Sequence, residues 1–116
     1  MRDVRQYLHD LRVEITAVEQ FSADGEAAFL RDERTQYAVM MAYARIGEIV
    51  KRIPESLLMT QPLVAWKEIK GFRDMLMHRY FDIKIVRVWE AVEQLPALRV
   101  AVEALLAELP PDEEPE

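Results

Sequence analysis

The residues with the clearest capacity for chemistry lie close together, between Arg73 and Tyr80. Arg73 is a permanent cation that can donate two parallel hydrogen bonds to a phosphate, and the Tyr80 hydroxyl can donate one. His78 lies between them, and histidine exchanges a proton readily near neutral pH. These are the parts needed to cleave RNA without a metal ion. The 2′-hydroxyl of the substrate attacks the adjacent phosphorus, His78 acts as general acid or base, and Arg73 stabilises charge on the phosphoryl oxygens.

The spacing of these residues sets a geometric condition on such a site. Each residue of a helix turns by about 100°, so Arg73 and Tyr80 nearly superpose, whereas Arg73 and His78 diverge by roughly 140°. Either the helix ends near Met77, or a second chain completes the site, as in a two-fold dimer. Gly71 lies shortly before the motif. It could admit a partner helix or simply be tolerated within a helix. The alternative interpretation is that the motif has no catalytic role, so that Arg73 simply faces solvent and His78 simply ends a helix.

Other kinds of site find little support in the sequence. Gly-rich phosphate loops, cysteines and Glu-x-x-His pairs are absent, and His9 and His78 do not share a metal-ligand spacing. We therefore expect no metal ion and no cofactor. The absence of cysteine, of a signal peptide and of a membrane-length apolar run favours a cytoplasmic protein without a membrane partner.

The net charge of -6 argues against a nucleic-acid partner, but the charges are unevenly distributed. Residues 110–116 hold four acidic residues and no basic one, whereas residues 67–87 hold six basic residues against three acidic ones. The basic excess in 67–87 is consistent with an ordinary solvated helix surface or with a rim around an anion site.

The elements that must position the motif are all helical, because the sequence has three glycines, no asparagine and apolar residues at helical spacing. One helix is expected over about 3–21, ended by residues 22–25, where Ser22 or Asp24 could cap the next element. A second helical region follows, is interrupted near Asp32 and stops at Pro54. A loose turn then leads to a third helix, with Pro62 in its first turn. A fourth is capped by Asp82, and Pro96 kinks or restarts it. The prediction is an all-α antiparallel bundle of four to five helices over residues 1–109, with a disordered acidic tail over 110–116.

The segment from Gly71 to Tyr80 resembles the Arg-x4-His-x-Tyr signature of HepT-like proteins of the HEPN superfamily. Agreement extends in matching order over about residues 1–109. The similar stretches are Phe21-Ser22-Ala23-Asp24-Gly25, Arg34-Thr35-Gln36-Tyr37-Ala38-Val39, Ile46-Gly47-Glu48, Trp66-Lys67-Glu68-Ile69, Trp89 and Leu95-Pro96. One departure is Asp74, where many relatives carry Asn. A carboxylate there could orient Arg73 or offset part of its charge.

The resemblance implies a homodimeric HEPN bundle with the motif in a cleft at the interface. It also implies the ribonuclease toxin of a type VII-like toxin–antitoxin pair. Arg73 and His78 match the catalytic positions, with Asp74 in a supporting place. Tyr80 matches the tyrosine to which an MNT-type nucleotidyltransferase antitoxin transfers AMP, and the added charge would repel RNA. Lys70 and Arg79 are candidate contacts to RNA phosphates.

The alternative hypothesis is a nucleotide-responsive helical dimer that binds a nucleotidyltransferase and cleaves nothing. Its partner surface would be lined by aromatic and methionine side chains that could equally belong to the core. These are Tyr37, Met40, Met41, Tyr43, Trp66 and Trp89. The opposite assignment, that this chain is the antitoxin, has little support because the chain lacks the nucleotidyltransferase Gly-Ser loop and its paired metal-binding aspartates.

Overall fold

The chain is all-α over residues 3–110, the part that the computed structural model describes, which confirms the predicted fold class. Its elements in order are α1 Val4–Phe21, α2 Glu26–Arg31, α3 Glu33–Lys51, α4 Glu55–Leu58, α5 Trp66–His78, the 3-10 turn η1 Tyr80–Asp82, α6 Ile85–Glu93 and α7 Leu95–Glu108. The disorder expected for the acidic tail falls on residues that, apart from Pro110, lie outside the described part. Pro110 itself receives a hydrogen bond from Arg5 on its carbonyl.

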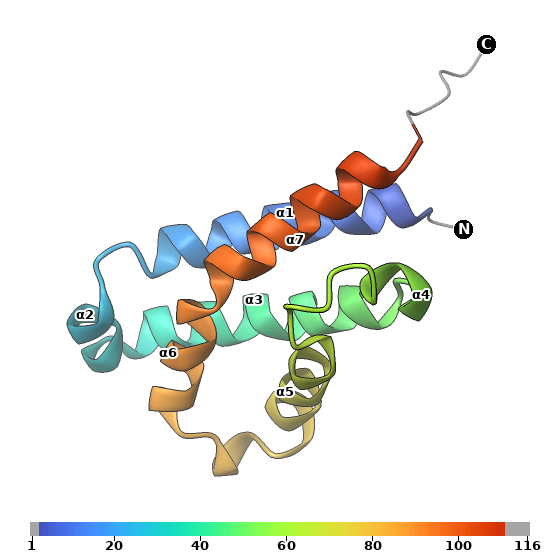
Figure 1. Cartoon of the computed structure of the whole chain (residues 1–116). Coiled ribbons are helices and arrows are strands. Elements are labelled where there is room, and N and C mark those ends of the chain that lie inside the picture. The colour runs from blue at the N-terminus through green and yellow to red at the C-terminus, as the bar shows by residue number, and fades with distance from the viewer. Residues whose placement is uncertain (1–2, 111–116) are drawn as a thin grey trace.

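Three long helices form the body of the molecule (Figure 1). α1 and α3 run antiparallel, α7 returns antiparallel along α1, and α5 packs on α3. The principal dimensions are 50 × 26 × 26 Å. The long helix α3 therefore separates α1 from α5, so it both completes the core and carries the helix on which the motif lies.

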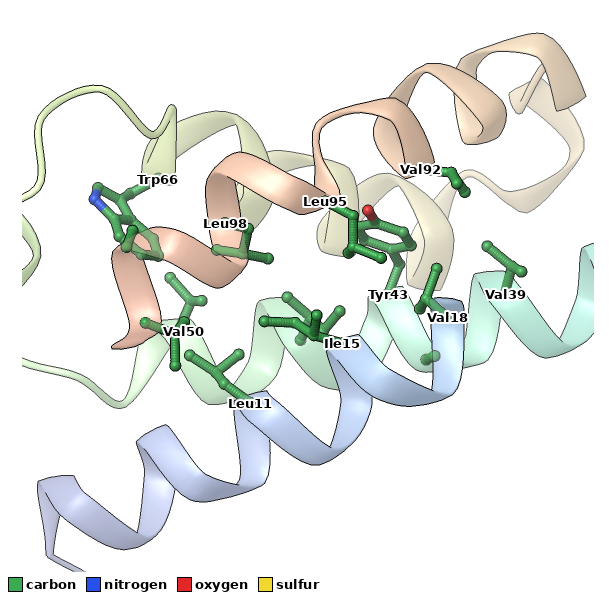
Figure 2. Close-up of a cluster of buried hydrophobic side chains, with 14 of the residues drawn as sticks. Leu11, Ile15, Val18, Val39, Tyr43, Val50, Trp66, Val92, Leu95 and Leu98 are labelled. Atoms are coloured by element: carbon green, nitrogen blue, oxygen red, sulfur yellow. The ribbon is translucent and has the colours of Figure 1, made fainter. Parts of the chain in front are cut away.

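The core lies where the apolar stripes of α1, α3 and α7 meet. Figure 2 shows Leu11 and Ile15 of α1 pointing toward Val50 of α3 and Leu98 of α7. The four residues predicted as the inward stripe of the first helix, Leu8, Leu11, Ile15 and Val18, are fully buried. A side chain that is fully buried contributes about 1.5–3 kcal/mol. This cluster therefore fixes α3 firmly beneath α1.

Two turns differ from the sequence prediction for one common reason. Neither Ser22 nor Asp24 caps α2, because the N-cap is Gly25 with φ of 90°, and Ser22 Oγ donates to the Val18 carbonyl at 2.7 Å. Likewise Asp82 does not cap α6. It lies in η1 and pairs with Arg79 at 3.4 Å, and Lys84 precedes α6 instead. In each case the side chain, Ser22 or Asp82, finds a partner earlier in the chain and not at the start of the helix that follows.

The start of α5 also differs from the prediction. Pro62 does not lie in the first turn of this helix, which begins four residues later at Trp66. The buried Trp66 side chain donates from Nε1 to the Gln61 carbonyl at 2.9 Å, so the segment between them folds back as a turn. Two other expectations are confirmed: the second helical region is interrupted at Asp32, and the helix restarts at Pro96, which lies in the first turn of α7. The structure adds that Asp32 caps α3, accepting from the Arg34 amide at 3.1 Å.

Candidate functional site

Arg73 lies at the contact between α5 and α3, and Gly47 is the reason it can lie there. A Cβ atom placed on Gly47 would be 2.2 Å from Arg73 Cβ and 3.2 Å from the Ile69 carbonyl oxygen, so no larger residue fits without moving the helices. Gly47 is buried, and the Arg73 side chain is 21% exposed. The close approach of α5 to α3 at Gly47 therefore holds the base of the Arg73 side chain against α3, while its guanidinium still reaches the surface.

The Arg73 guanidinium is held by two carboxylates. Its Nη2 atom lies 2.9 Å from Glu48 Oε2, and its Nη1 atom lies 3.2 Å from Asp74 Oδ1. Two further cations from α3 extend this arrangement, since Arg52 Nη2 lies 3.0 Å from Glu48 Oε1 and Lys51 pairs with Asp74. We call these five residues the charge ladder.

The ladder perturbs the acidity of Asp74. Hydrogen bonds from Lys51 first, and then from Arg73, hold the pKa of the Asp74 carboxyl below its usual value. Asp74 is therefore a carboxylate at neutral pH. It bonds to Arg73, as the sequence suggested it could, and it also offsets part of the charge of Arg73.

His78 is the last residue of α5, and its side chain is exposed. The chain leaves helical geometry at Arg79, with φ of -133° and ψ of 39°, so the helix ends close to the predicted point. This break does not bring His78 to Arg73, because within residues 3–110 no hydrogen bond joins the two side chains. The helix therefore ends near the predicted point, but one chain alone does not bond His78 to Arg73.

Tyr80 lies just beyond α5 and stacks on Tyr37 from α3. The ring centroids are 6.3 Å apart with 11° between the planes, and Phe81 meets Tyr80 edge-on at 5.5 Å. Hydrogen bonding with the Tyr37 hydroxyl raises the pKa of Tyr80 above its usual value. The side chain remains 42% exposed, so its hydroxyl is both positioned and accessible.

The two predicted phosphate contacts are both engaged in ion pairs. Lys70 lies 3.0 Å from Glu55, and Arg79 lies 3.4 Å from Asp82. Acidic side chains therefore pair with much of the excess positive charge of residues 67–87 at the surface. In the charge ladder, by contrast, cations from two helices lie close together.

Most of the residues considered for a partner surface belong to the core. Met40, Tyr43 and Trp66 are buried, and Trp89 packs against Phe29 with ring centroids 5.3 Å apart. Burial also raises the pKa of Tyr43, whose hydroxyl donates to the Ala91 carbonyl at 2.5 Å. Tyr37 and Met41 remain exposed, and Tyr37 lies beside the motif through its contact with Tyr80.

The sequence motif did not point to Lys51 as part of the site. A recognisable pattern was present, because Gly47, Glu48 and Lys51 lie within one turn or so of a single helix. The sequence could not indicate that this turn meets Arg73, since the two segments are more than twenty residues apart in the chain. Their contact is a result of packing.

Three other features of the described residues give no further evidence about the motif: surface depressions, clusters of metal-ligating side chains, and long apolar helices. Two shallow depressions lie along α1, one of them shared with α3, and neither includes Arg73, His78 or Tyr80. Over residues 3–110 no cluster of three or more metal-ligating side chains occurs. No helix in the same range is long and apolar enough to cross a membrane.

Comparison with known proteins gives a consistent result. The family model described as "Ribonuclease HepT-like" matches residues 11–105. A protein of Thermococcus cleftensis named "Probable ribonuclease HepT" is 35% identical over 106 residues, covering 90% of this chain and 96% of the relative. A protein of Methanocaldococcus jannaschii named "Putative RNase MJ0125" is 30% identical over 110 residues, covering 93% of this chain and 95% of the relative. No solved structure matches the chain.

Proposed function

Because the chain belongs to the HepT-like ribonuclease family, we propose that it cleaves RNA without a metal ion, using Arg73 and His78. The observation that carries this proposal is the position of the two residues on α5. Arg73 is held against α3 in the middle of the helix, and His78 ends the helix with its side chain exposed. Membership in the family confirms the predicted enzyme class, and the roles of individual residues are our assignment. The proposal treats residues 1–109 as one HEPN-like domain acting in the cytoplasm, since the family match extends over 11–105.

The reaction that fits these groups is a transesterification within the RNA. His78 removes the proton from a 2′-hydroxyl, the new bond forms between that oxygen and the adjacent phosphorus, and the bond to the 5′-oxygen breaks. The leaving oxygen takes up a proton, and the products are a cyclic phosphate and a free 5′-hydroxyl. Arg73 neutralises the extra charge on the phosphoryl oxygens during the reaction.

We propose that two copies of the chain complete the site. In one chain His78 is exposed, has no bond to Arg73 and points away from it by roughly 140° around the helix. Exposed apolar side chains lie at this end of α5: Met77 in its last turn, Phe81 just beyond it, and Tyr37 stacked on Tyr80, with Phe81 97% exposed. A homodimer that covers them could bring His78 of one chain toward Arg73 of the other.

Tyr80 supplies a means of control. We propose that this chain is the toxin of a toxin–antitoxin pair and that an MNT-type nucleotidyltransferase adenylylates Tyr80. The tyrosine oxygen attacks the α-phosphorus of ATP, and pyrophosphate leaves. Tyr80 follows His78 by two residues and is accessible, so the attached phosphate would place negative charge beside the RNA site.

The test is cleavage of RNA by the purified protein in the presence of EDTA. We expect wild-type activity to persist and the variants His78→Ala and Arg73→Ala to lose at least about 100-fold. General acid–base catalysis by His78 contributes that much or more, and so does stabilisation of developing charge by one donor such as Arg73. His9→Ala is the matched control, since His9 is the other histidine and is exposed on α1. Equal cleavage by all three variants would show that the assigned site is wrong.

The regulatory part is tested separately. After co-expression with an MNT-type nucleotidyltransferase and ATP, intact mass should increase by AMP units in wild type and remain unchanged in Tyr80→Phe. A stable complex with the nucleotidyltransferase together with intact RNA would instead favour the non-catalytic alternative.

A further inference from the structure

One oxygen atom in the charge ladder receives cations from two helices. The Oδ1 atom of Asp74 pairs with Lys51 Nζ and also lies 3.2 Å from Arg73 Nη1. Lys51 comes from the end of α3 and Arg73 from the middle of α5. A lysine and an arginine that converge on one oxygen form the arrangement that proteins use to bind a phosphoryl oxygen.

The rest of the ladder directs Arg73 toward this point. Glu48 holds Nη2 of Arg73 at 2.9 Å, and Glu48 is in turn held by Arg52 at 3.0 Å. One edge of the guanidinium is thereby anchored to α3, and Nη1 faces Asp74 and Lys51. The orientation of Arg73 therefore has one support, Glu48, that does not involve Asp74.

The carboxylate of Asp74 is the most exposed of the three side chains that meet at this point. Its side chain is 50% exposed, compared with 32% for Lys51 and 21% for Arg73. Exposed ion pairs contribute little to stability, so Asp74 can rotate outward without disturbing the core. With Asp74 turned away, three cations of the ladder face the single carboxylate of Glu48.

We propose that Lys51 and Arg73 together form the binding site for a phosphodiester group of RNA, and that Asp74 occupies this site as an internal competitor until RNA displaces it. The inference rests on the proposed ribonuclease function and adds to it an RNA-binding residue outside the sequence motif. A phosphoryl oxygen takes the place of Asp74 Oδ1, and Glu48 continues to hold the other edge of Arg73.

The test measures binding of a single-stranded 2′-O-methyl RNA, which lacks the attacking hydroxyl and stays intact. Fluorescence anisotropy at several salt concentrations gives both the affinity and its salt dependence. The variants are Lys51→Gln, Lys51→Arg and Asp74→Asn. Arg45→Gln is the matched control, because Arg45 also lies on α3 and pairs with a carboxylate of another helix, Glu14, at 3.3 Å. Circular dichroism verifies that each variant is folded.

We expect Lys51→Gln to weaken binding about tenfold, the lower range for a charge-assisted hydrogen bond. The slope of log affinity against log salt should fall by about 0.7, the value for one lost contact to a single strand. Lys51→Arg should bind nearly as well as wild type, and Asp74→Asn should bind several-fold more tightly.

Two results would overturn the inference: a Lys51→Gln variant that behaves like Arg45→Gln, or an Asp74→Asn variant that binds no more tightly than wild type. Parallel cleavage of unmodified RNA separates this failure from failure of the proposed function. Wild type that neither cleaves nor binds RNA would remove both proposals. Cleavage by wild type with normal binding by Lys51→Gln would remove this one alone.

Discussion

Replacing Gly47 with alanine tests directly whether the contact between α3 and α5 positions Arg73. The added Cβ would be 2.2 Å from Arg73 Cβ, at least 1.2 Å short of the 3.4 Å at which ordinary contact begins. Neither the added Cβ nor Arg73 Cβ is the end of a flexible side chain, so neither can move aside. The Ile69 carbonyl oxygen, 3.2 Å from the added Cβ, prevents a shift in that direction as well. The two helices must therefore separate.

The expected cost can be worked from two opposing terms. Overpacking costs about 1–3 kcal/mol, and the severity of this overlap favours the upper end. Replacing glycine by alanine within a helix returns about 1 kcal/mol. The net loss is about 2 kcal/mol, which corresponds to a fall in Tm of roughly 8 °C for a chain of 116 residues.

The assay is thermal and urea denaturation, with Gly71→Ala as the matched control. Gly71 lies in α5, and a Cβ there would meet nothing within 4 Å, so this variant should be slightly more stable than wild type. Gly47→Ala should also cleave RNA more slowly, because Arg73 moves with α5. A Gly47→Ala protein as stable and as active as wild type would refute the assigned contact.

Two further predictions concern the tyrosines. Tyr43→Phe should cost about 1 kcal/mol in urea denaturation, because it removes one hydrogen bond while the Ala91 carbonyl still accepts from the Gln94 amide at 3.1 Å; a loss above about 3 kcal/mol would contradict this. Tyr37→Phe keeps the stacked ring but should lower the pKa of Tyr80 toward 10.0, as measured by carbon NMR of the tyrosine rings, and an unchanged pKa would contradict the bond. Since the folded-state pKa of Tyr80 is the raised one, the stabilisation from this hydrogen bond is present below about pH 10 and is lost as pH rises through the folded value.

The helices of this protein were predictable because their signals are local. The stripe of Leu8, Leu11, Ile15 and Val18 repeats at helical spacing and is buried as expected. The interruption near Asp32 and the restart at Pro96 were also predicted, and both residues act within a few positions of their own place in the chain. Periodicity and capping carried these predictions without knowledge of the tertiary structure.

The wrong predictions involved residues with more than one local partner available. Ser22, Pro62 and Asp82 all have the chemistry of helix starts, yet each lies in a turn. Ser22 bonds back into α1, and Asp82 pairs with Arg79. Pro62 precedes a segment fixed by the burial of Trp66. A sequence pattern cannot rank such alternatives, because the choice depends on which side chain the core has already buried.

The candidate site shows the same division between local and long-range information. The motif places Arg73 and His78 on one short segment, and nothing in its spacing indicates that Glu48 and Lys51 approach from α3. That approach depends on Gly47, whose missing side chain allows α5 to come close enough for the ladder to form. The consequence is that the face of α5 carrying Arg73 packs against α3. His78 lies on another face, roughly 140° away from Arg73 around the helix axis. Within one chain Arg73 is held against α3 and His78 is exposed at the helix end, and this separation is the reason why we propose that a second copy of the chain completes the site.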